Sequence, residues 1–161
     1  MRRDEAAPSG SQPGRGVVRG VIRRVIFDTS TLVSAALRPD SVPARALLLA
    51  LQRCDLCASQ ETLAELRKVM GRAKFRAWLS DELRQEFVGL IERSSRQFAA
   101  GKDFAGRPAC RDAKDNKFLA LAAAAEADAM VSVDEDLLVL DPWGRMRMLR
   151  AGEFLELFGE R

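Results

Sequence analysis

The chain of 161 residues has a hydrophobic fraction of 47% and a charged fraction of 30%, proportions typical of a folded globular domain. It has no apolar run near the about 20 residues that span a bilayer, and no apolar stretch follows Arg2 and Arg3 as in a secretory signal, so we expect a cytoplasmic protein without a membrane partner. The chain contains no His and no Tyr, which excludes a Ser–His–Asp triad, an imidazole base and a His-ligated metal.

The net charge of +3 gives little support to nucleic-acid binding on its own, because residues 1–20 contribute +2 of it. Any basic footprint must therefore be local. Residues 1–20 are rich in Gly, Pro, Ser and Arg and lack apolar periodicity, so they are predicted to form a disordered extension, with a tail that grips RNA as the alternative. Residues 21–161 are predicted to form one domain.

The first half of that domain reads as strand, two helices, strand and helix. The β-branched stretch 21–27 predicts a buried parallel strand, and a short helix is expected over 29–37. Pro43 lies near the start of a second helix. A short strand is predicted over 55–58, and Ser59 is expected to cap a helix with the apolar side chains Leu63, Leu66, Val69 and Met70.

The second half has a long helical section before the strands resume. Residues 72–100 carry no strand signal and are predicted to form a helical pair that closes over the sheet, followed by a connector, 101–110, with room for one short strand. The remaining elements are a helix over 114–126, a strand over 129–133, a turn over 141–144, a strand over 146–149 and a helix over 152–158. Alternating strands and helices predict an α/β sandwich around a largely parallel sheet.

Cys54 and Cys57 form a C-x-x-C motif, and Cys110 is the third cysteine. Three cysteines do not make a disulfide framework, and without histidine they fall short of the four ligands of a zinc site. A redox pair would normally open a helix after a strand, whereas residues 56–58 read as the strand itself. We interpret the pair as small buried side chains.

Two aspartates follow predicted strands: Asp28 follows residues 21–27, and Asp134 follows residues 129–133. In open α/β sheets, ligands bind outside the carboxyl ends of the strands, so neighbouring strands would bring the two carboxylates together there. Such a pair is tolerated mainly when a cation neutralises it, and oxygen ligands suit Mg²⁺ or Mn²⁺. A lone aspartate in this position is more often a turn or helix-capping residue.

Further acids lie near the starts of predicted helices. Glu65 belongs to the helix that follows the strand 55–58, and Asp112 and Asp115 open the helix 114–126. One of these two aspartates is expected to cap its helix, because a carboxylate accepts hydrogen bonds from free N–H groups there. The joint pattern of acids at strand ends and helix starts is stronger than any single member.

Four ordered stretches resemble the motifs of the PIN-domain family and together cover residues 24–158. The family's opening DTNxLVSA motif is matched by VIFDTSTLVSAAL, and its second motif, with a single essential Glu, by SQETLAELRKVM. Its third and fourth motifs, in the form CRDPxDNKFL…ADxxVTGDxDLL, are matched by CRDAKDNKFLALAAAAEADAMVSVDEDLLVL, and its closing element by AGEFLELF. This form is typical of a branch regarded as toxins of toxin–antitoxin pairs.

The resemblance implies an α/β/α sandwich with a parallel sheet of about five strands. It also implies a pocket in which acids hold one or two divalent ions, Mg²⁺ or Mn²⁺, and activate water for phosphodiester hydrolysis. Carried over residue by residue, it assigns catalysis and metal binding to Asp28, Glu65, Asp115 and Asp134, with Asp112 and Asp136 as auxiliary ligands. Asp115 is preferred to Asp112 because it better fits the family's spacing to Asp134.

The chain departs from the family motifs without losing a carboxylate. Ser30 replaces an Asn, Ala113 replaces a Pro, and Ser132 with Val133 replaces Thr-Gly, so the metal site is expected to survive. The retained hydroxyls are candidate substrate contacts.

Basic and aromatic residues offer further contacts to a nucleic acid. Flanking phosphates could be held by Arg111, Lys114 and Lys117, alongside the hydroxyls of Ser30 and Ser132. The three basic side chains could equally balance the local acids or face solvent. For Trp143, packing in its turn is favoured over base stacking, and the aromatics of the helical pair, Phe75, Trp78 and Phe87, are expected to pack inside it.

These observations predict a metal-dependent endoribonuclease, in which metal-bound water takes the place of a histidine base. The toxin branch adds an antitoxin protein as an expected partner, and the family adds a homodimer, although we find no interface signature. The main alternative is a catalytically silent PIN-fold module that binds protein. An aspartyl-phosphate phosphatase is disfavoured because it would need an Asp at the position of Ser30.

Overall fold

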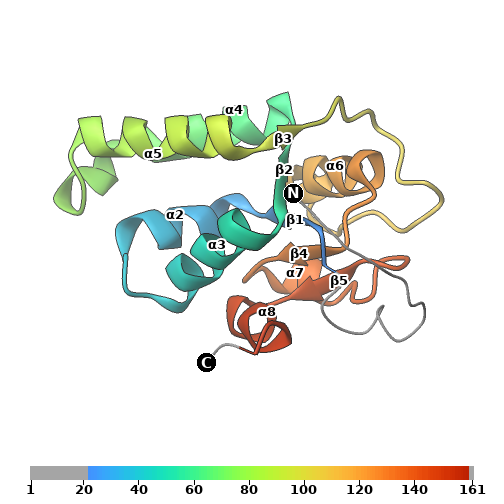
Figure 1. Cartoon of the computed structure of the whole chain (residues 1–161). Helices are drawn as coiled ribbons and strands as arrows, with labels where there is room; N and C mark the ends of the chain where they lie inside the picture. The colour runs from blue at the N-terminus through green and yellow to red at the C-terminus, as the bar shows by residue number, and fades with distance from the viewer. Residues whose placement is uncertain (1–21, 160–161) are drawn as a thin grey trace.

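The computed structural model describes residues 22–159, which fold around one five-stranded sheet (Figure 1). All four neighbouring pairs of strands are parallel, in the order β3-β2-β1-β4-β5. The strands are β1 (Arg24–Phe27), β2 (Asp55–Ala58), β3 (Arg96–Gln97), β4 (Ala129–Val131) and β5 (Arg147–Leu149). The predicted α/β fold with a mainly parallel sheet of about five strands is confirmed.

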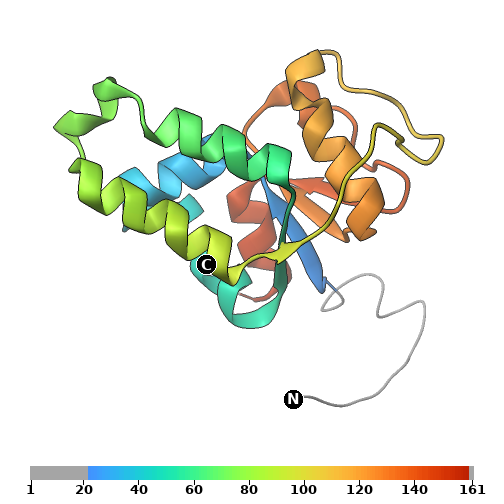
Figure 2. The same cartoon turned by 90° about the horizontal axis from the view of Figure 1, so that it is seen from above.

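Helices cover both faces of this sheet and complete the three layers seen in Figures 1 and 2. One face is packed by α2 (Thr29–Leu37), α3 (Val42–Arg53), α4 (Gln60–Met70), α5 (Asp81–Ser94) and α8 (Ala151–Leu157). The other face is packed by α6 (Asn116–Ala125) and α7 (Glu135–Leu138). Two 3₁₀ turns, η1 (Ala73–Ala77) and η2 (Ala113–Asp115), precede α5 and α6.

Side chains of the central strands alternate between two hydrophobic cores. In β1, Val25 and Phe27 join the core under α2 to α5, whereas Ile26 joins the core under α6. In β4, Met130 likewise points away from its neighbours Ala129 and Val131. Because both faces are covered, every buried position of these two strands is apolar, which explains the continuous runs in the sequence.

Several helices begin where the sequence predicted a capping residue. Ser59 and Thr62 form a capping box at the start of α4, and Asp28 caps α2, whose bounds agree with the predicted 29–37. Asp112 caps η2 through the N–H of Lys114, whereas Asp115 makes no capping bond to α6. The expectation that one of the two caps the start of this helical segment is confirmed for Asp112.

The prediction for the middle of the chain was wrong in one respect. Residues 96–97 form β3, within the section that lacked a strand signal, and the connector 101–110 contains no strand. β3 is two exposed polar residues paired through their backbone with Cys57 and Ala58, so it has no apolar alternation for a sequence pattern to reveal.

Two further expectations concern the N-terminal extension and a membrane-spanning helix. The predicted extension, residues 1–20, lies outside the described residues. Among residues 22–159, no helix is both long enough and apolar enough to cross a membrane.

Candidate active site

Asp28 and Asp134 lie at the carboxyl ends of neighbouring strands and are joined through one serine. The pairing of β1 with β4 ends at Phe27 and Val131, and Ser132 directly follows Val131. The hydroxyl of Ser132 donates to Oδ2 of Asp28 over 2.5 Å and accepts a bond from the backbone N–H of Asp134 over 2.9 Å. The site is therefore assembled at the sheet edge where α/β proteins bind ligands.

Both aspartates also cap helices, and the caps orient their carboxylates. Oδ1 of Asp28 accepts from the N–H and the hydroxyl of Thr31, at 2.9 and 2.6 Å. Oδ1 of Asp134 accepts from the N–H of Asp136 at 2.9 Å. A carboxylate has about four lone-pair sites, so a capping role leaves room for a further ligand.

Asp115 adds a third carboxyl group that lacks a cationic partner. Its Oδ2 is buried and has no hydrogen-bond partner among the described residues. Burial, a bond to the Asp134 carboxyl and the negative charges of Asp134, Asp112 and Asp28 raise the pKa of Asp115 to about 7. The carboxyl groups of Asp115 and Asp134 can share a hydrogen bond only when one of them holds a proton.

Asp28 is affected in the same direction. Burial is the main cause that raises its pKa, with a contribution from the charge of Asp134, while the bonds from Ser132 and Thr31 oppose the rise. Asp28 is 4% exposed, so water screens its charge poorly. Together, Asp28, Asp115 and Asp134 form a cluster of negative charge, which we call the acid cluster.

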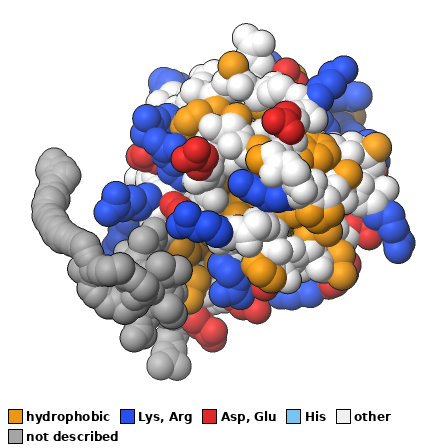
Figure 3. All heavy atoms as spheres, turned by 90° about the vertical axis from the view of Figure 1, so that its right-hand side faces the viewer, with side chains coloured by type: hydrophobic (Ala, Val, Ile, Leu, Met, Phe, Trp, Pro, Cys, Tyr) orange, Lys and Arg blue, Asp and Glu red, His pale blue; other side chains and the backbone are white. Residues whose placement is uncertain are grey.

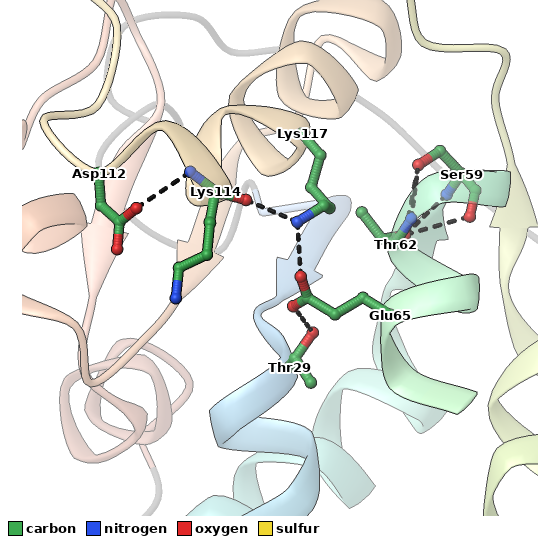
Figure 4. A network of polar contacts seen from close by, with 7 residues as sticks. All are labelled: Thr29, Ser59, Thr62, Glu65, Asp112, Lys114 and Lys117. Carbon is green, nitrogen blue, oxygen red and sulfur yellow. Dashed lines mark hydrogen bonds and ion pairs between the residues drawn. The ribbon is translucent and has the colours of Figure 1, made fainter. Parts of the chain in front are cut away.

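Both carboxylate oxygens of Glu65 bind residues outside the acid cluster (Figure 4). Its Oε2 accepts from the hydroxyl of Thr29 at 2.5 Å, and its Oε1 pairs with the ammonium of Lys117 at 2.5 Å. Lys117 also donates to the carbonyl of Lys114 at 2.6 Å. Lys117 therefore balances the charge of Glu65, which was one of the two roles considered for it.

The remaining predicted substrate residues lie at the margin of the site. Arg111 lies 3.8 Å from Asp136, and its side chain is 89% exposed. Lys114 is exposed, and Figure 4 shows its ammonium directed away from Glu65. Ser30 is exposed as well, and Thr31, not Ser30, donates its hydroxyl to Asp28.

Sequence reasoning overlooked Thr29 and Thr31, the two residues that hold Glu65 and Asp28 in place. The signal was present in the letters DTST after the first strand, since hydroxyl side chains beside a buried carboxylate are natural donors to it.

Comparison with protein families gives a match between residues 24–136 and the PIN domain. The chain belongs to the PIN-domain family. The matched segment runs from β1 to Asp136 and contains all four predicted catalytic acids. PIN domains are in general metal-dependent nucleases. No curated protein matches this chain.

The acid cluster of this PIN domain suits a divalent metal ion in its chemistry. Within residues 22–159, no three Asp, Glu or Cys side chains form a ready-made metal cage. The cluster nevertheless offers hard oxygen donors: Oδ2 of Asp115 is unpartnered, and burial, together with the neighbouring acids, raises the pKa of Asp115 and Asp28. Such donors favour Mg²⁺ or Mn²⁺, which would compete with the proton for Asp115.

Other side chains singled out in the sequence pack inside the PIN domain. Trp143 is completely buried, and its indole N–H donates to the carbonyl of Pro108 at 2.7 Å, so the packing role is confirmed. Burial raises the pKa of Cys54 to about 12 and that of Cys57 to about 11. These thiols stay protonated, in agreement with their interpretation as packing residues.

The face made by the right-hand side of Figure 1 has no single basic strip. Over the part that grey atoms leave visible, Figure 3 shows Lys and Arg side chains in several separate places among hydrophobic and uncharged atoms. On this visible surface, a nucleic-acid contact would depend on local groups, in line with the small net charge.

Proposed function

We propose that this PIN domain is a Mg²⁺- or Mn²⁺-dependent endoribonuclease that hydrolyses RNA phosphodiester bonds. The observation that carries the proposal is the acid cluster: three carboxyl groups share one sheet edge without a cationic partner among the described residues. A structural cluster of acids would be expected to hold an arginine or lysine, whereas a metal site must leave its oxygens available.

In this proposal, Asp28, Asp115 and Asp134 hold the ion, with Asp112 and Asp136 as auxiliaries and Glu65 reaching it after release from Lys117. When bound, such an ion would supply Lewis acidity and lower the pKa of a water molecule. Thr31 and Ser132 fix Asp28, and Thr29 fixes Glu65. Lys117, once released, and the exposed Lys114 and Arg111 neutralise phosphate oxygens.

Substitution of Asp28 by Asn tests the catalytic assignment. The amide keeps the shape of the side chain but removes the negative charge, so Mn²⁺-dependent cleavage of a labelled RNA should fall at least about 100-fold. A folded Asp28→Asn protein that cleaves RNA as fast as the wild type would overturn the assignment.

A catalytically silent PIN-fold scaffold is the second candidate, because Lys117 already occupies Glu65 and no ready-made cage is present among residues 22–159. Calorimetric titration with Mn²⁺ separates the two proposals. A nuclease should bind the ion in a manner that Asp28→Asn and Asp134→Asn abolish, whereas a scaffold should give no such heat.

The biological setting is a further part of the proposal. We infer that this chain is the toxin of a toxin–antitoxin pair. It would act in the cytoplasm, be held by an antitoxin and form a homodimer. The motif forms quoted above support the toxin role. Co-expression with the product of an adjacent small reading frame should suppress growth inhibition by this chain.

A further inference from the structure

A groove of about 640 Å³ lies between the end of α2, the start of α3 and η1. Its apolar lining includes Leu37, Pro43 and two aromatic rings, those of Phe75 and Trp78. Phe75 is partly buried against the main core, but Trp78 is 55% exposed. The prediction that Trp78 packs inside the helical pair was therefore wrong, and the exposed indole needs another explanation.

The rings in this groove carry cations on their faces. The guanidinium of Arg38 lies 5.7 Å from the ring centre of Trp78, and the ammonium of Lys74 lies 5.2 Å from that of Phe75. Neither cation forms an ion pair within residues 22–159, and no acid lines the groove. The nearby Asp40 is exposed in the turn after α2. The groove thus combines positive charge with open aromatic surface.

A buried arginine braces the turn that carries this indole. Arg84 is 3% exposed, and its guanidinium donates to the carbonyls of Met70, Arg72 and Leu79 and pairs with Asp81. These bonds tie the end of α4 and both ends of η1 to the start of α5. Trp78 is therefore presented from a braced turn, as a preformed binding surface requires.

The groove is connected to the acid cluster by two helices. α2 begins directly after Asp28 and ends at Leu37, while α4 carries Glu65 in its second turn and ends just before η1. Figures 1 and 2 show α2 and α4 projecting from the sheet toward the same end of the molecule. A nine-residue helix is about 13 Å long, so the groove lies within reach of a few nucleotides from a phosphodiester at the acids.

We propose that this groove is a subsite for unpaired RNA, in which a base stacks on Trp78 while Arg38 and Lys74 contact the adjoining phosphates; this rests on the proposed ribonuclease function. Every base offers a π-face to an aromatic side chain, and the phosphates complement the uncompensated cations. An acidic peptide would satisfy the cations but would leave the indole unused, so RNA fits the groove better.

Tryptophan fluorescence tests the subsite directly, because the chain has only two tryptophans and Trp143 is fully buried. In EDTA, which prevents metal-dependent cleavage, unstructured oligoadenylate should quench the emission of the exposed Trp78. Trp78→Ala should weaken the binding of fluorescently labelled RNA at least about fivefold, and Trp78→Phe should retain most of it. Leu48→Ala provides the control, because Leu48 on α3 is 56% exposed and lies outside the groove lining.

Charge is tested separately from stacking. Arg38→Gln with Lys74→Gln should reduce the salt dependence of RNA binding by about 0.7 in slope for each lost phosphate contact. Unchanged RNA affinity in Trp78→Ala overturns the subsite. Polyglutamate that quenches Trp78 and displaces RNA at equal charge concentration also overturns it, in favour of an acidic protein partner.

The outcome remains distinguishable from that of the proposed nuclease function. With Mn²⁺ present, Trp78→Ala should slow cleavage of a long RNA but not of a dinucleotide, which is too short to reach from the acids to the groove. RNA binding through Trp78 without any cleavage would leave the subsite standing and remove the nuclease proposal. Cleavage of long RNA at wild-type rate by Trp78→Ala would leave the nuclease proposal standing and remove the subsite.

Discussion

Acidic side chains have opposite surroundings at the two edges of the parallel sheet. At the amino edge, the carboxylate of Asp128 accepts bonds from the N–H groups of Arg23 and Arg24, each at 2.9 Å. Asp141 pairs with Arg147 at 2.9 Å and accepts the N–H of Met148. At the carboxyl edge, Asp28 and Asp115 face other carboxyl groups.

The pKa values reflect this difference. Burial raises the pKa of Asp141, but the bonds from Arg147 and Met148 outweigh it, so the pKa lies below its ordinary value. Burial raises the pKa of Asp28 and Asp115 as well, and there the neighbouring acids add to the rise. At the amino edge, the acids stabilise the fold through ion pairs and hydrogen bonds. At the carboxyl edge, the charged form of the acids is disfavoured, and a bound cation would stabilise it.

The substitution Asp115→Asn tests this difference between the two edges most strongly. We expect Mn²⁺-dependent RNA cleavage to fall at least about 100-fold, because a hard oxygen ligand is lost. In EDTA at pH 8, the same variant should raise the free energy of unfolding by about 1 kcal/mol, since solvent screens much of the repulsion at a partly exposed carboxyl. Cleavage assays and urea unfolding measure the two effects, and a variant that is both active and destabilised would contradict our assignment.

Proton linkage is the next largest effect. In the metal-free protein, the pKa of Asp115 is about 7, compared with 3.8 for an ordinary aspartate, so the folded state holds an extra proton between these values. Stability should fall as pH rises from about 4 to about 7 and then level off. Over the same interval, Mn²⁺ should bind more tightly with rising pH and release up to one proton per ion.

Calorimetry in buffers with different ionisation enthalpies counts that proton. Asp115→Asn, which lacks the titrating group, serves as the control and should release less. Equal proton release by the variant and the wild type would mean that a group other than Asp115 releases the proton.

Asp141→Asn makes the matched change at the amino edge. It should lower the free energy of unfolding by about 1 kcal/mol at neutral pH, because its bonds to Arg147 and Met148 weaken. The pKa of Asp141 is depressed in the folded state, so its contribution is present above the unfolded pKa and is lost as pH falls through the folded one. Denaturation at pH 7 and pH 3 tests this, and RNA cleavage at wild-type rate should persist.

Lys117→Met gives the smallest expected effect. Removing the ammonium leaves Glu65 with Thr29 as its remaining partner, so metal-free stability should fall by less than about 1 kcal/mol, as for other partly exposed ion pairs. The affinity for Mn²⁺ should rise severalfold, because Glu65 no longer has to leave a lysine. A lower affinity, measured by calorimetry, would mean that Lys117 orients Glu65 toward the ion.

The sequence predicted those parts of the site that follow from strand ends. Asp28 and Asp134 could be placed together because buried parallel strands leave continuous apolar runs, and the residue after each run lies at the carboxyl edge. β3 could not be predicted, because its pairing uses only the backbone of two polar residues.

Side-chain contacts over long separations were also beyond the sequence. Glu65 and Lys117 are 52 residues apart, and their contact depends on how α4 and α6 are placed beside β1 and β2. Trp78 lies in a turn that Arg84 braces through the carbonyls of Met70 and Arg72, and these contacts cannot be read from the sequence. Periodicity predicts that a residue faces inward, but it does not reveal a turn held away from the core.

The shortness of the two edge strands has a consequence for solution behaviour. A free sheet edge is a template for pairing with another chain, and proteins limit the risk with short edge strands and charged residues. Here β3 has two residues and β5 three, and each begins with an exposed arginine, Arg96 or Arg147. Although the sheet is parallel and open, it offers little length for intermolecular β-pairing, so the folded protein should resist aggregation through its sheet edges.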